Sequence, residues 1–232
     1  MFILNTRPKN QAQSLNDLIK KTGGNFFNLP AIKIIPIAYQ QPNLNNLDYI
    51  IFQSANAVKY FFKQSELQKI HSKIIAIGPA TQKSLENLGF KNIILPNVFS
   101  SMGILKILYN IQNKKILIIS GKNPKLTLLN QLQKNNTDVN IISCYQRICP
   151  KYNMNIVFQK LLQNNINIIV STSFEGLKNL LDIFQNHLDW LFAKTLCVIS
   201  EAMSVFAKSH GFSTVIQSKN ATNHAIIEAL VT

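Results

Sequence analysis

Six short turns in this chain combine hydroxyl, glycine or basic residues in a way that suits the binding of an anion. They are Asn5-Thr6-Arg7, Ser54-Ala55-Asn56, Gly78-Pro79-Ala80-Thr81, Ser120-Gly121-Lys122, Ser171-Thr172-Ser173 and Ser200-Glu201. Most precede a helical pattern, and a helix N-terminus presents free backbone N–H groups and a positive dipole end. Serine, threonine and asparagine also cap helices that bind nothing. Capping alone explains any one turn, whereas six of them in one chain favour a binding site.

The turns lack the groups that usually carry cofactor or nucleophilic chemistry. The segments GPATQKSLENLG and SGKNPKL match neither a dinucleotide-binding motif nor a phosphate loop. Ser54 and Ser173 lack the Gly-x-Ser-x-Gly elbow of an exposed nucleophile. The histidines lie in expected helices or loops rather than at strand ends: His71, His187, His210 and His224. We therefore expect no cofactor and a site poor in acid–base groups, in which Glu201 is the exception and equally suits the first turn of a helix.

Cysteine usage and the N-terminus indicate a cytoplasmic protein. Cys144, Cys149 and Cys197 are odd in number and fit no zinc spacing, so we expect reduced thiols and no metal. The start MFILNTRPKN does not resemble a signal peptide. No window reaches 18 uncharged apolar residues, so we expect no membrane span.

The net charge of +14 indicates either an anionic partner or a lysine-rich surface. Arg7 and Arg147 are the only arginines, and arginine grips a carboxylate with a planar fork that lysine lacks. A nucleic-acid surface would interleave basic residues with exposed aromatic ones. Phenylalanines here lie mostly in apolar runs such as Phe61-Phe62, which favours core packing, so we expect no nucleic-acid partner.

Short apolar runs alternate with segments of helical spacing along the whole chain, which predicts α/β structure with parallel sheets. The expected strands are Phe2–Leu4, Ile32–Ile37, Tyr49–Phe52, Ile74–Ile77, Ile93–Leu95, Ile116–Ile119, Val139–Ile142, Ile166–Val170, Leu196–Ile199 and Thr214–Ile216. Gly23-Gly24 and Gly89 lie where helices should end, as left-handed caps. A further helix is expected to start near Leu177, after the turn that contains Ser173.

The two sequence halves repeat one plan of strand, helix, strand, connector and two further strand–helix units. The segment that begins KIIAIGPATQKSL aligns with the one that begins KTLCVISEAMSVF, and MFILNTRP aligns with KILIISGKNP. Open parallel sheets bind ligands at the carboxyl ends of their strands. We therefore expect two sets of strand ends that could face each other across a cleft.

Eight segments, in order and spacing, resemble the uroporphyrinogen-III synthase family. They are NTRP at 5–8, LPAIKIIP at 29–36, IIFQSANAV at 50–58, AIGPATQKSL at 76–85, FSSMGIL at 99–105, CYQR at 144–147, STSFEGL at 171–177 and VISEAMSVFAKSHGF at 198–212. The CYQR and ISE forms are similar to those of proteobacterial members.

The resemblance implies two parallel-sheet α/β domains joined by a two-stranded β ladder, with the chain crossing between them. Residues 1–31 and 150–232 would form one domain and 40–141 the other, with 32–39 and 142–149 as the ladder. The repeat alone would place a simple boundary near residue 112.

The family's reaction closes the linear tetrapyrrole hydroxymethylbilane, which carries eight carboxylates, while inverting its last pyrrole, ring D. Loss of the terminal hydroxyl as water leaves an azafulvene, which ring D attacks to give a spiro intermediate. The resemblance implies that Tyr145 of CYQR helps the hydroxyl to leave. Hydroxyls and backbone N–H groups would hold the acid arms at Thr6, Ser54, Asn56, Gly78, Thr81, Ser173 and Ser200, while Arg7 and Lys122 steer the substrate in.

The resemblance further implies a monomeric hydro-lyase of haem biosynthesis, without cofactor, that takes its substrate from the preceding pathway enzyme. Two departures affect single contacts. Met203 stands where many members have threonine in a second Gly-Pro-x-Thr turn, and SGKNPK at 120–125 has fewer glycines than the usual RGxGGR. A non-catalytic two-domain module that binds a small polyanion remains the alternative.

Overall fold

The computed structural model describes residues 1–64, 70–109, 111–135 and 137–231. The chain divides into two compact units. The terminal unit contains Met1–Ile34 and Ile148–Thr232, and the central unit contains Ile35–Arg147. Each unit is thus an α/β body built from segments of both sequence halves.

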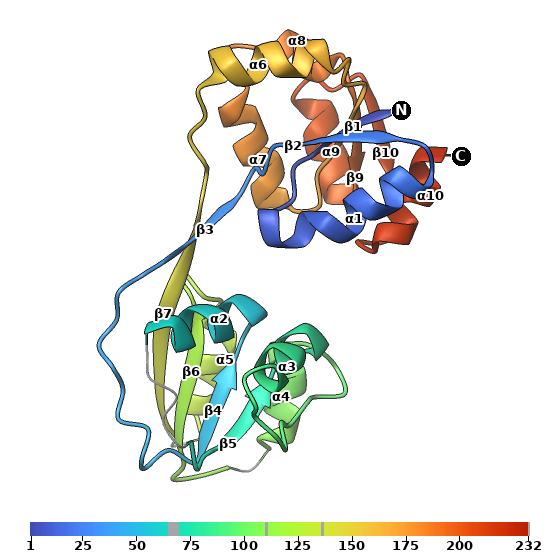
Figure 1. Ribbon diagram of the computed structural model, residues 1–232. Helices are drawn as coiled ribbons and strands as arrows, with labels where there is room; N and C mark the ends of the chain where they lie inside the picture. Colours follow the sequence, from blue (N-terminus) through green and yellow to red (C-terminus); the bar gives the residue numbers. More distant parts are fainter. Residues whose placement is uncertain (65–69, 110, 136, 232) are drawn as a thin grey trace. The chain divides into compact units, whose positions relative to one another are not determined.

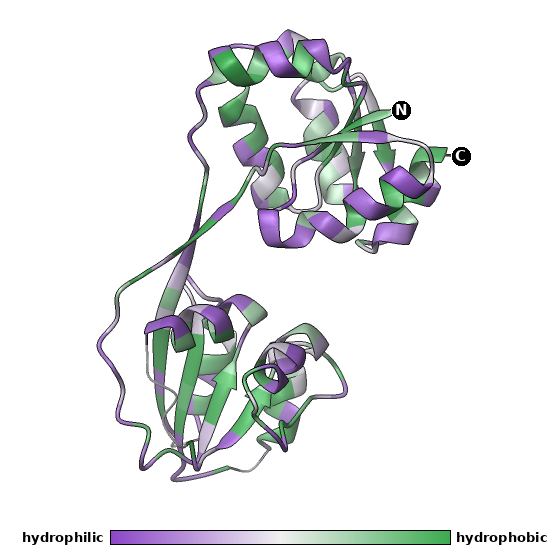
Figure 2. Cartoon of the chain, viewed as in Figure 1, coloured by the Kyte–Doolittle hydropathy of each residue, from purple (hydrophilic) through white to green (hydrophobic). Residues whose placement is uncertain are grey.

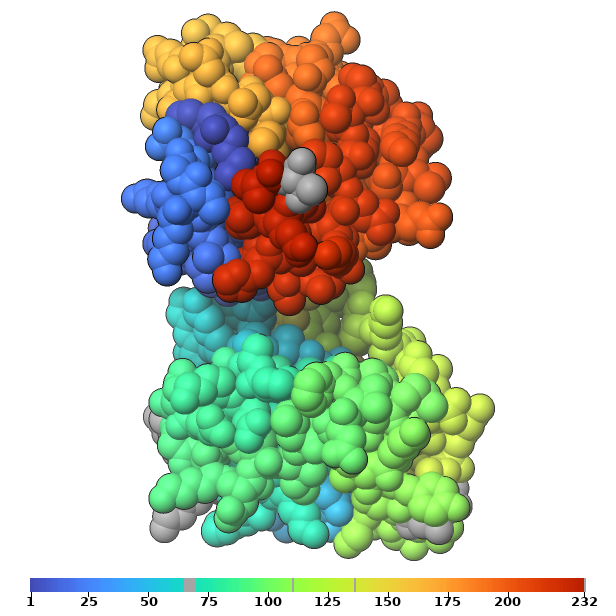
Figure 3. All heavy atoms as spheres, turned by 90° about the vertical axis from the view of Figure 1, so that its right-hand side faces the viewer, coloured from blue at the N-terminus to red at the C-terminus, as the bar shows by residue number. Residues whose placement is uncertain are grey.

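The terminal unit holds a parallel sheet in the order β10-β9-β8-β1-β2 (Figure 1). Its strands are β1 (Phe2–Asn5), β2 (Asn25–Asn28), β8 (Ile168–Val170), β9 (Thr195–Val198) and β10 (Thr214–Gln217). Its helices, among the described residues, are α1 (Lys9–Lys21), α6 (Met154–Gln163), α7 (Phe174–Ile183), α8 (Leu188–Phe192), α9 (Glu201–Ser209) and α10 (Asn223–Val231). Figure 3 shows α1, in blue, beside α10, in red, and these two helices are in contact.

The central unit holds the second sheet, in the order β3-β7-β6-β4-β5. Its strands are β3 (Lys33–Pro36), β4 (Tyr49–Phe52), β5 (Lys73–Ala76), β6 (Lys115–Gly121) and β7 (Asp138–Ile148). Its helices, among the described residues, are α2 (Ala55–Gln64), α3 (Pro79–Glu86), α4 (Ser101–Ile107) and α5 (Thr127–Gln133). The strands from β7 to β5 pair in parallel, and the chain passes between the units along β3 and β7, which are adjacent.

The two sheets repeat one strand order, which confirms the predicted α/β class and its parallel sheets. β2-β1-β8-β9 in the terminal unit corresponds to β7-β6-β4-β5 in the central unit. The next position is filled by β10 in the terminal unit but only by an isolated parallel bridge between Ile75 and Ile94 in the central unit. The strand expected at Ile93–Leu95 is therefore wrong, because a single pair of residues continues the sheet there.

Alternate strand residues enter opposite cores, as the pleat of a strand requires. In β1, Leu4 joins a cluster with residues of α6, α7 and α9, whereas Ile3 joins one with α1 and α10. In the central unit, Ile51 packs with residues of α4 and α5, whereas Phe52 contacts two phenylalanines of α2, one edge-to-face and one stacked. Figure 2 shows the strands of both sheets mainly green, as strands covered on both faces should be.

Several predicted boundaries differ from the structure. β2 was not expected, because its pattern of Asn25-Phe26-Phe27-Asn28 is apolar over only two residues. The expected start of α7 near Leu177 is wrong, because Ser173 caps the helix and the first turn begins at Phe174. Gly23 and Gly89 have positive φ, which confirms their role as left-handed caps, whereas Gly24 does not.

Candidate active site

Ser54 and Tyr145 meet at the carboxyl end of the central sheet. Ser54 follows β4 and Tyr145 lies in β7, 91 residues further along the chain, and Ser54 Oγ lies 3.0 Å from Tyr145 Oη. Ser54 Oγ also accepts the backbone N–H of Ala57 at 3.0 Å, which caps α2. Tyr145 is 5% exposed, so its phenol reaches the sheet edge from a mostly buried ring.

An irregularity in β7 and a glycine in β6 bring the phenol to this position. β6 lies between β7 and β4 in the sheet, and its register with β7 shifts between Ser120 and Gly121. Ser120 pairs with Ser143 and Gly121 with Tyr145, so β7 carries an extra residue, Cys144. Such bulges re-aim the side chains beside them. A Cβ on Gly121 would lie 2.7 Å from Tyr145 Cζ, so the ring needs a glycine in the intervening strand.

Neighbouring groups hold the tyrosine from two further sides. The ring of Tyr60, on α2, stacks with that of Tyr145 at a centroid distance of 5.9 Å. Cys144 is fully buried, and its thiol donates to Ala57 O at 3.4 Å and to Ser120 O at 3.5 Å. Burial raises the pKa of the Cys144 thiol to about 12, so at neutral pH it keeps its single proton, which the two carbonyl oxygens share.

The other candidates of the central unit lie at the same carboxyl edge or follow it directly. Gly78 is the N-cap residue of α3, after β5, and makes no side-chain cap, and Pro79 occupies the first helical position. Thr81 is 3% exposed, and its backbone N–H donates to Gly78 O at 3.0 Å. Asn56 is half-buried in the first turn of α2. Lys122 has an exposed side chain, and its backbone N–H donates to Tyr145 O at 2.7 Å.

In the terminal unit, the side chains of Asn5 and Thr6 make hydrogen bonds within the protein. Asn5 is fully buried, donates to Asn16 Oδ1 at 2.8 Å and accepts the backbone N–H of Arg7 at 3.2 Å. Thr6 is 4% exposed, and its hydroxyl donates to Val170 O at 2.7 Å. This turn is therefore fixed by neutral hydrogen bonds before any ligand arrives.

Arg7 is a half-buried cation whose described hydrogen-bond partners are all neutral. Its Nη1 donates to Asn223 Oδ1 and its Nη2 donates to Ala221 O at 3.0 Å. Its Nε is buried and has no partner among the described residues. Burial lowers the pKa of the guanidinium, which still remains charged because arginine does not lose its proton in proteins. A carboxylate would supply the missing negative charge.

Ser173 and Ser200 cap helices in the terminal unit as Ser54 does in the central one. Ser173 Oγ accepts the N–H of Gly176 at 3.0 Å, and Ser200 Oγ accepts the N–H of Met203 at 3.4 Å. Met203 is 2% exposed and belongs to the core, so it offers nothing at the sheet edge. Glu201 is the exposed first residue of α9. Capping is thus real in all three turns.

The sequence does not single out the residues that support the tyrosine. Gly121 was expected only as part of a turn, Cys144 only as a reduced thiol and a member of the CYQR segment, and Tyr60 was not a candidate. A glycine at the end of an apolar strand is the one signal that was available, because an isolated strand glycine often marks a close approach of other atoms. Which atoms approach depends on strand order and register, which the pattern does not contain.

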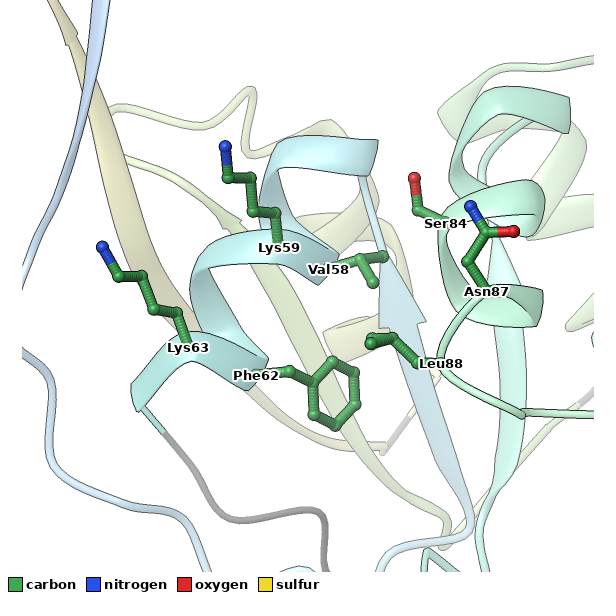
Figure 4. Close-up of a pocket in the computed structure, with 7 residues that line it drawn as sticks. All are labelled: Val58, Lys59, Phe62, Lys63, Ser84, Asn87 and Leu88. Atoms are coloured by element: carbon green, nitrogen blue, oxygen red, sulfur yellow. The ribbon is translucent and has the colours of Figure 1, made fainter. Parts of the chain in front are cut away.

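A surface pocket of the central unit lies between α2 and α3 and contains none of the predicted site residues. Figure 4 shows its lining residues, Val58, Lys59, Phe62, Lys63, Ser84, Asn87 and Leu88. Val58, Phe62 and Leu88 form its apolar part, which the two lysines of α2 flank. Ser54, the cap of α2, is not among the residues that line it.

Comparisons with known proteins identify the family of this chain. The family model described as uroporphyrinogen-III synthase HemD matches residues 13–228. The chain belongs to the uroporphyrinogen-III synthase family. The uroporphyrinogen-III synthase of Escherichia coli (strain K12) is 26% identical over 249 residues, which cover 99% of this chain and 100% of that protein. That of Salmonella typhimurium is 25% identical with the same coverage.

Solved structures of the family share the fold. Uroporphyrinogen-III synthetase from Helicobacter pylori superposes with a TM-score of 0.67 at 16% identity, over 99% of this chain and 97% of that one. A mutant uroporphyrinogen III synthase from Thermus thermophilus gives a TM-score of 0.58 at 10% identity, over 100% and 97%. Among the described residues, no helix of this family member combines the length and apolar character needed to cross a bilayer.

Proposed function

We propose that this chain converts hydroxymethylbilane into uroporphyrinogen III and water, with inversion of ring D through a spiro intermediate. Its membership of the uroporphyrinogen-III synthase family, matched over residues 13–228, carries the proposal. Because bilane also closes without an enzyme, to the uninverted isomer, the protein must hold one folded conformer and stabilise the charged species on the path.

The turns at the strand ends of each unit offer hydrogen-bond donors for the carboxylates of the substrate. A serine that caps a helix uses an oxygen lone pair to accept a backbone N–H, and its own proton stays free to be donated. Ser173 and Ser200 can therefore cap α7 and α9 and still donate to a carboxylate. Gly78 and Asn56 offer uncapped backbone N–H and amide groups, and charge-assisted hydrogen bonds are worth about 1.5–3 kcal/mol each.

Arg7 is the residue of the terminal unit best suited to bind a carboxylate of the substrate. Its charge is half-buried and its described hydrogen-bond partners are neutral, so a carboxylate that reaches the guanidinium gains a charge-assisted bond without displacing an existing ion pair. Lys122 is exposed and contributes long-range attraction. Thr6 and Thr81 are nearly buried, and their backbone N–H groups donate to Val170 O and Gly78 O, so these residues shape the turns rather than offer free donors.

Tyr145 is the proton donor for the departing hydroxyl. The C–O bond of the terminal hydroxymethyl group breaks with its electron pair moving to oxygen, and the phenol proton completes a molecule of water. General acid catalysis of this kind contributes about 10²–10⁴-fold. The proton that leaves the α-carbon of ring D when the macrocycle closes restores the phenol, so the step balances without a cofactor.

The test is the isomer that forms. Purified protein supplied with freshly prepared hydroxymethylbilane should yield mainly the type III product, separated from type I by chromatography after oxidation to porphyrin. Product that stays type I at high protein concentration would refute the activity and favour the non-catalytic polyanion-binding module. In that case calorimetry should still detect saturable binding of the bilane.

The state and surroundings of the protein belong to the same proposal. We expect a cytoplasmic monomer whose substrate arrives from the enzyme that makes the bilane. Light scattering should give a mass close to 26.2 kDa. Direct transfer predicts that an added trap for free bilane does not lower the yield when both enzymes are present, whereas complete loss of product to the trap would exclude handover.

A further inference from the structure

Ser54 makes a contact that distinguishes it from the other capping serines of the candidate site. Ser173 and Ser200 bond through Oγ to the backbone N–H three residues on. Ser54 makes the same bond to Ala57 and, in addition, lies 3.0 Å from Tyr145 Oη. The three serines therefore cap their helices in the same way, and only Ser54 also contacts the phenol of Tyr145.

The cap leaves the proton of Ser54 available for the hydrogen bond between the two hydroxyls, in which either oxygen can donate. A hydroxyl has one proton and two acceptor positions. Ser54 Oγ uses one acceptor position for the N–H of Ala57, and its own proton needs an acceptor in a half-buried place. Tyr145 Oη lies within reach. If Ser54 donates to it, the phenol proton is left free to point elsewhere.

We propose that Ser54 is a positioning residue for Tyr145, whose hydroxyl donates to the phenol oxygen and so directs the phenol proton at the substrate's leaving hydroxyl. The inference rests on the proposed function. When Tyr145 transfers its proton and the C–O bond breaks, the phenolate that forms keeps the hydrogen bond from Ser54. A bond to a charged acceptor is stronger than one to a neutral phenol, so Ser54 stabilises the transition state more than the bound substrate.

The surroundings make this pair a fixed feature of the central unit. The bulge at Cys144 aims the ring, Gly121 leaves room for it, and Tyr60 stacks on it. The thiol of Cys144 ties the same strand to Ala57 O, in the first turn of the helix that Ser54 caps. Movement of Tyr145 away from Ser54 would have to break several of these contacts.

The first experiment separates positioning from capping. Ser54→Ala removes the cap and the bond to Tyr145, whereas Ser100→Ala removes only a cap, since Ser100 Oγ accepts the N–H of Gly103 at 3.2 Å in the same unit. We expect both variants to unfold at similarly lower temperatures. kcat should fall about ten- to hundredfold in Ser54→Ala, as for loss of a hydrogen bond to a charged group, and stay unchanged in Ser100→Ala. Ser54→Thr, which keeps a hydroxyl, should recover most of the rate.

The second experiment tests whether Ser54 acts through the tyrosine. Steady-state kinetics are measured for Ser54→Ala, Tyr145→Phe and the double variant, since coupled residues give non-additive effects. Tyr145→Phe removes the phenol oxygen that accepts the hydrogen bond from Ser54. In that background Ser54→Ala should therefore change kcat by less than about twofold. KM should stay within about threefold in each case, because the contact is made to the enzyme and not to the substrate.

Independent effects would overturn the inference. If Ser54→Ala lowers kcat by the same factor in the Tyr145→Phe background as in the wild type, or raises KM about tenfold with kcat intact, Ser54 binds substrate directly and does not position the phenol. Either result leaves the synthase activity of the unchanged protein standing. Failure of the wild-type chain to produce type III isomer would instead reject the proposed function itself.

Discussion

The central and terminal units share a sheet order and a set of capped turns, yet their candidate groups differ in kind. The central unit brings a phenol to Ser54, with a glycine and a bulge shaped around it. At the matching place in the terminal unit, after β2, the chain continues as Leu29-Pro30-Ala31, and the backbone N–H groups of Leu29 and Ala31 donate to Asn5 O and Thr6 O. That unit instead carries a half-buried guanidinium. One repeat thus provides a proton donor and the other a charge.

The two units also differ at the amino ends of their strands, where corresponding residues precede β4 and β8. Asp48, before β4, accepts the backbone N–H of Lys115 at 2.9 Å, and Asn167, before β8, accepts that of Phe2 at the same distance. The central unit therefore uses a carboxylate where the terminal unit uses an amide. The repeat keeps the hydrogen bond and not the charge, which means that the two units should respond differently to acid.

The largest effect should come from Tyr145→Phe. We expect kcat for type III product to fall about 100-fold because the acid is lost, with only about 1 kcal/mol lost from the free energy of unfolding. Tyr152→Phe is the matched control in the terminal unit, since its phenol donates to Pro30 O at 2.7 Å. It should lose similar stability and no activity. Equal kcat in Tyr145→Phe would remove Tyr145 from the mechanism.

Gly121→Ala should disturb the geometry around Tyr145 without removing any polar group. The new Cβ would meet the ring of Tyr145 at 2.7 Å, so the ring or the strand must shift, at a cost of about 1–3 kcal/mol in stability. kcat should fall toward that of Tyr145→Phe. The double variant with Tyr145→Phe should be no slower than Tyr145→Phe alone, and a multiplied loss would mean that Gly121 serves something other than the phenol.

Arg7→Ala should weaken substrate binding rather than chemistry. Loss of a charge-assisted bond worth about 1.5–3 kcal/mol predicts a KM raised about ten- to hundredfold with kcat little changed. Lys9→Ala, which removes an exposed charge two residues away, controls for net charge and should raise KM by less than about twofold. An unchanged KM in Arg7→Ala would show that the guanidinium does not bind substrate and serves only its structural contacts with Asn223 and Ala221.

The smallest effect concerns acid and the Asp48 contact. The backbone N–H of Lys115 and the ammonium of Lys114 lower the pKa of the Asp48 carboxyl below its ordinary value. A lowered folded-state pKa gives stability that is present above the unfolded pKa, about 3.9, and is lost as the pH falls through the folded value. Asp48→Asn should therefore lose less Tm than the wild type between about pH 5 and 3, followed by circular dichroism. Parallel curves would show that the contact does not titrate.

Much of the fold was predictable because its signals are local. Apolar runs such as Tyr49–Phe52 alternate with amphipathic helices, and this alternation is enough to predict parallel sheets with crossover helices. The turns after the strands were predicted for the same reason. Weak or irregular elements were not: β2 has only two apolar residues, and β7 continues from Asp138 to Ile148 through polar and charged positions.

The sequence by itself determined the parallel α/β class and the hydroxyl-bearing turns, because both depend on residue types within short segments. It also determined the repeat, because the two halves can be aligned directly. Only the tertiary structure decided that Tyr145 reaches Ser54 and that Arg7 is buried among neutral partners. Those contacts join residues 91 and 216 positions apart, and they depend on strand order, a register shift and the absence of a side chain at Gly121. A pattern of apolar and polar residues fixes which face of a strand is buried, but not which distant strand lies beside it.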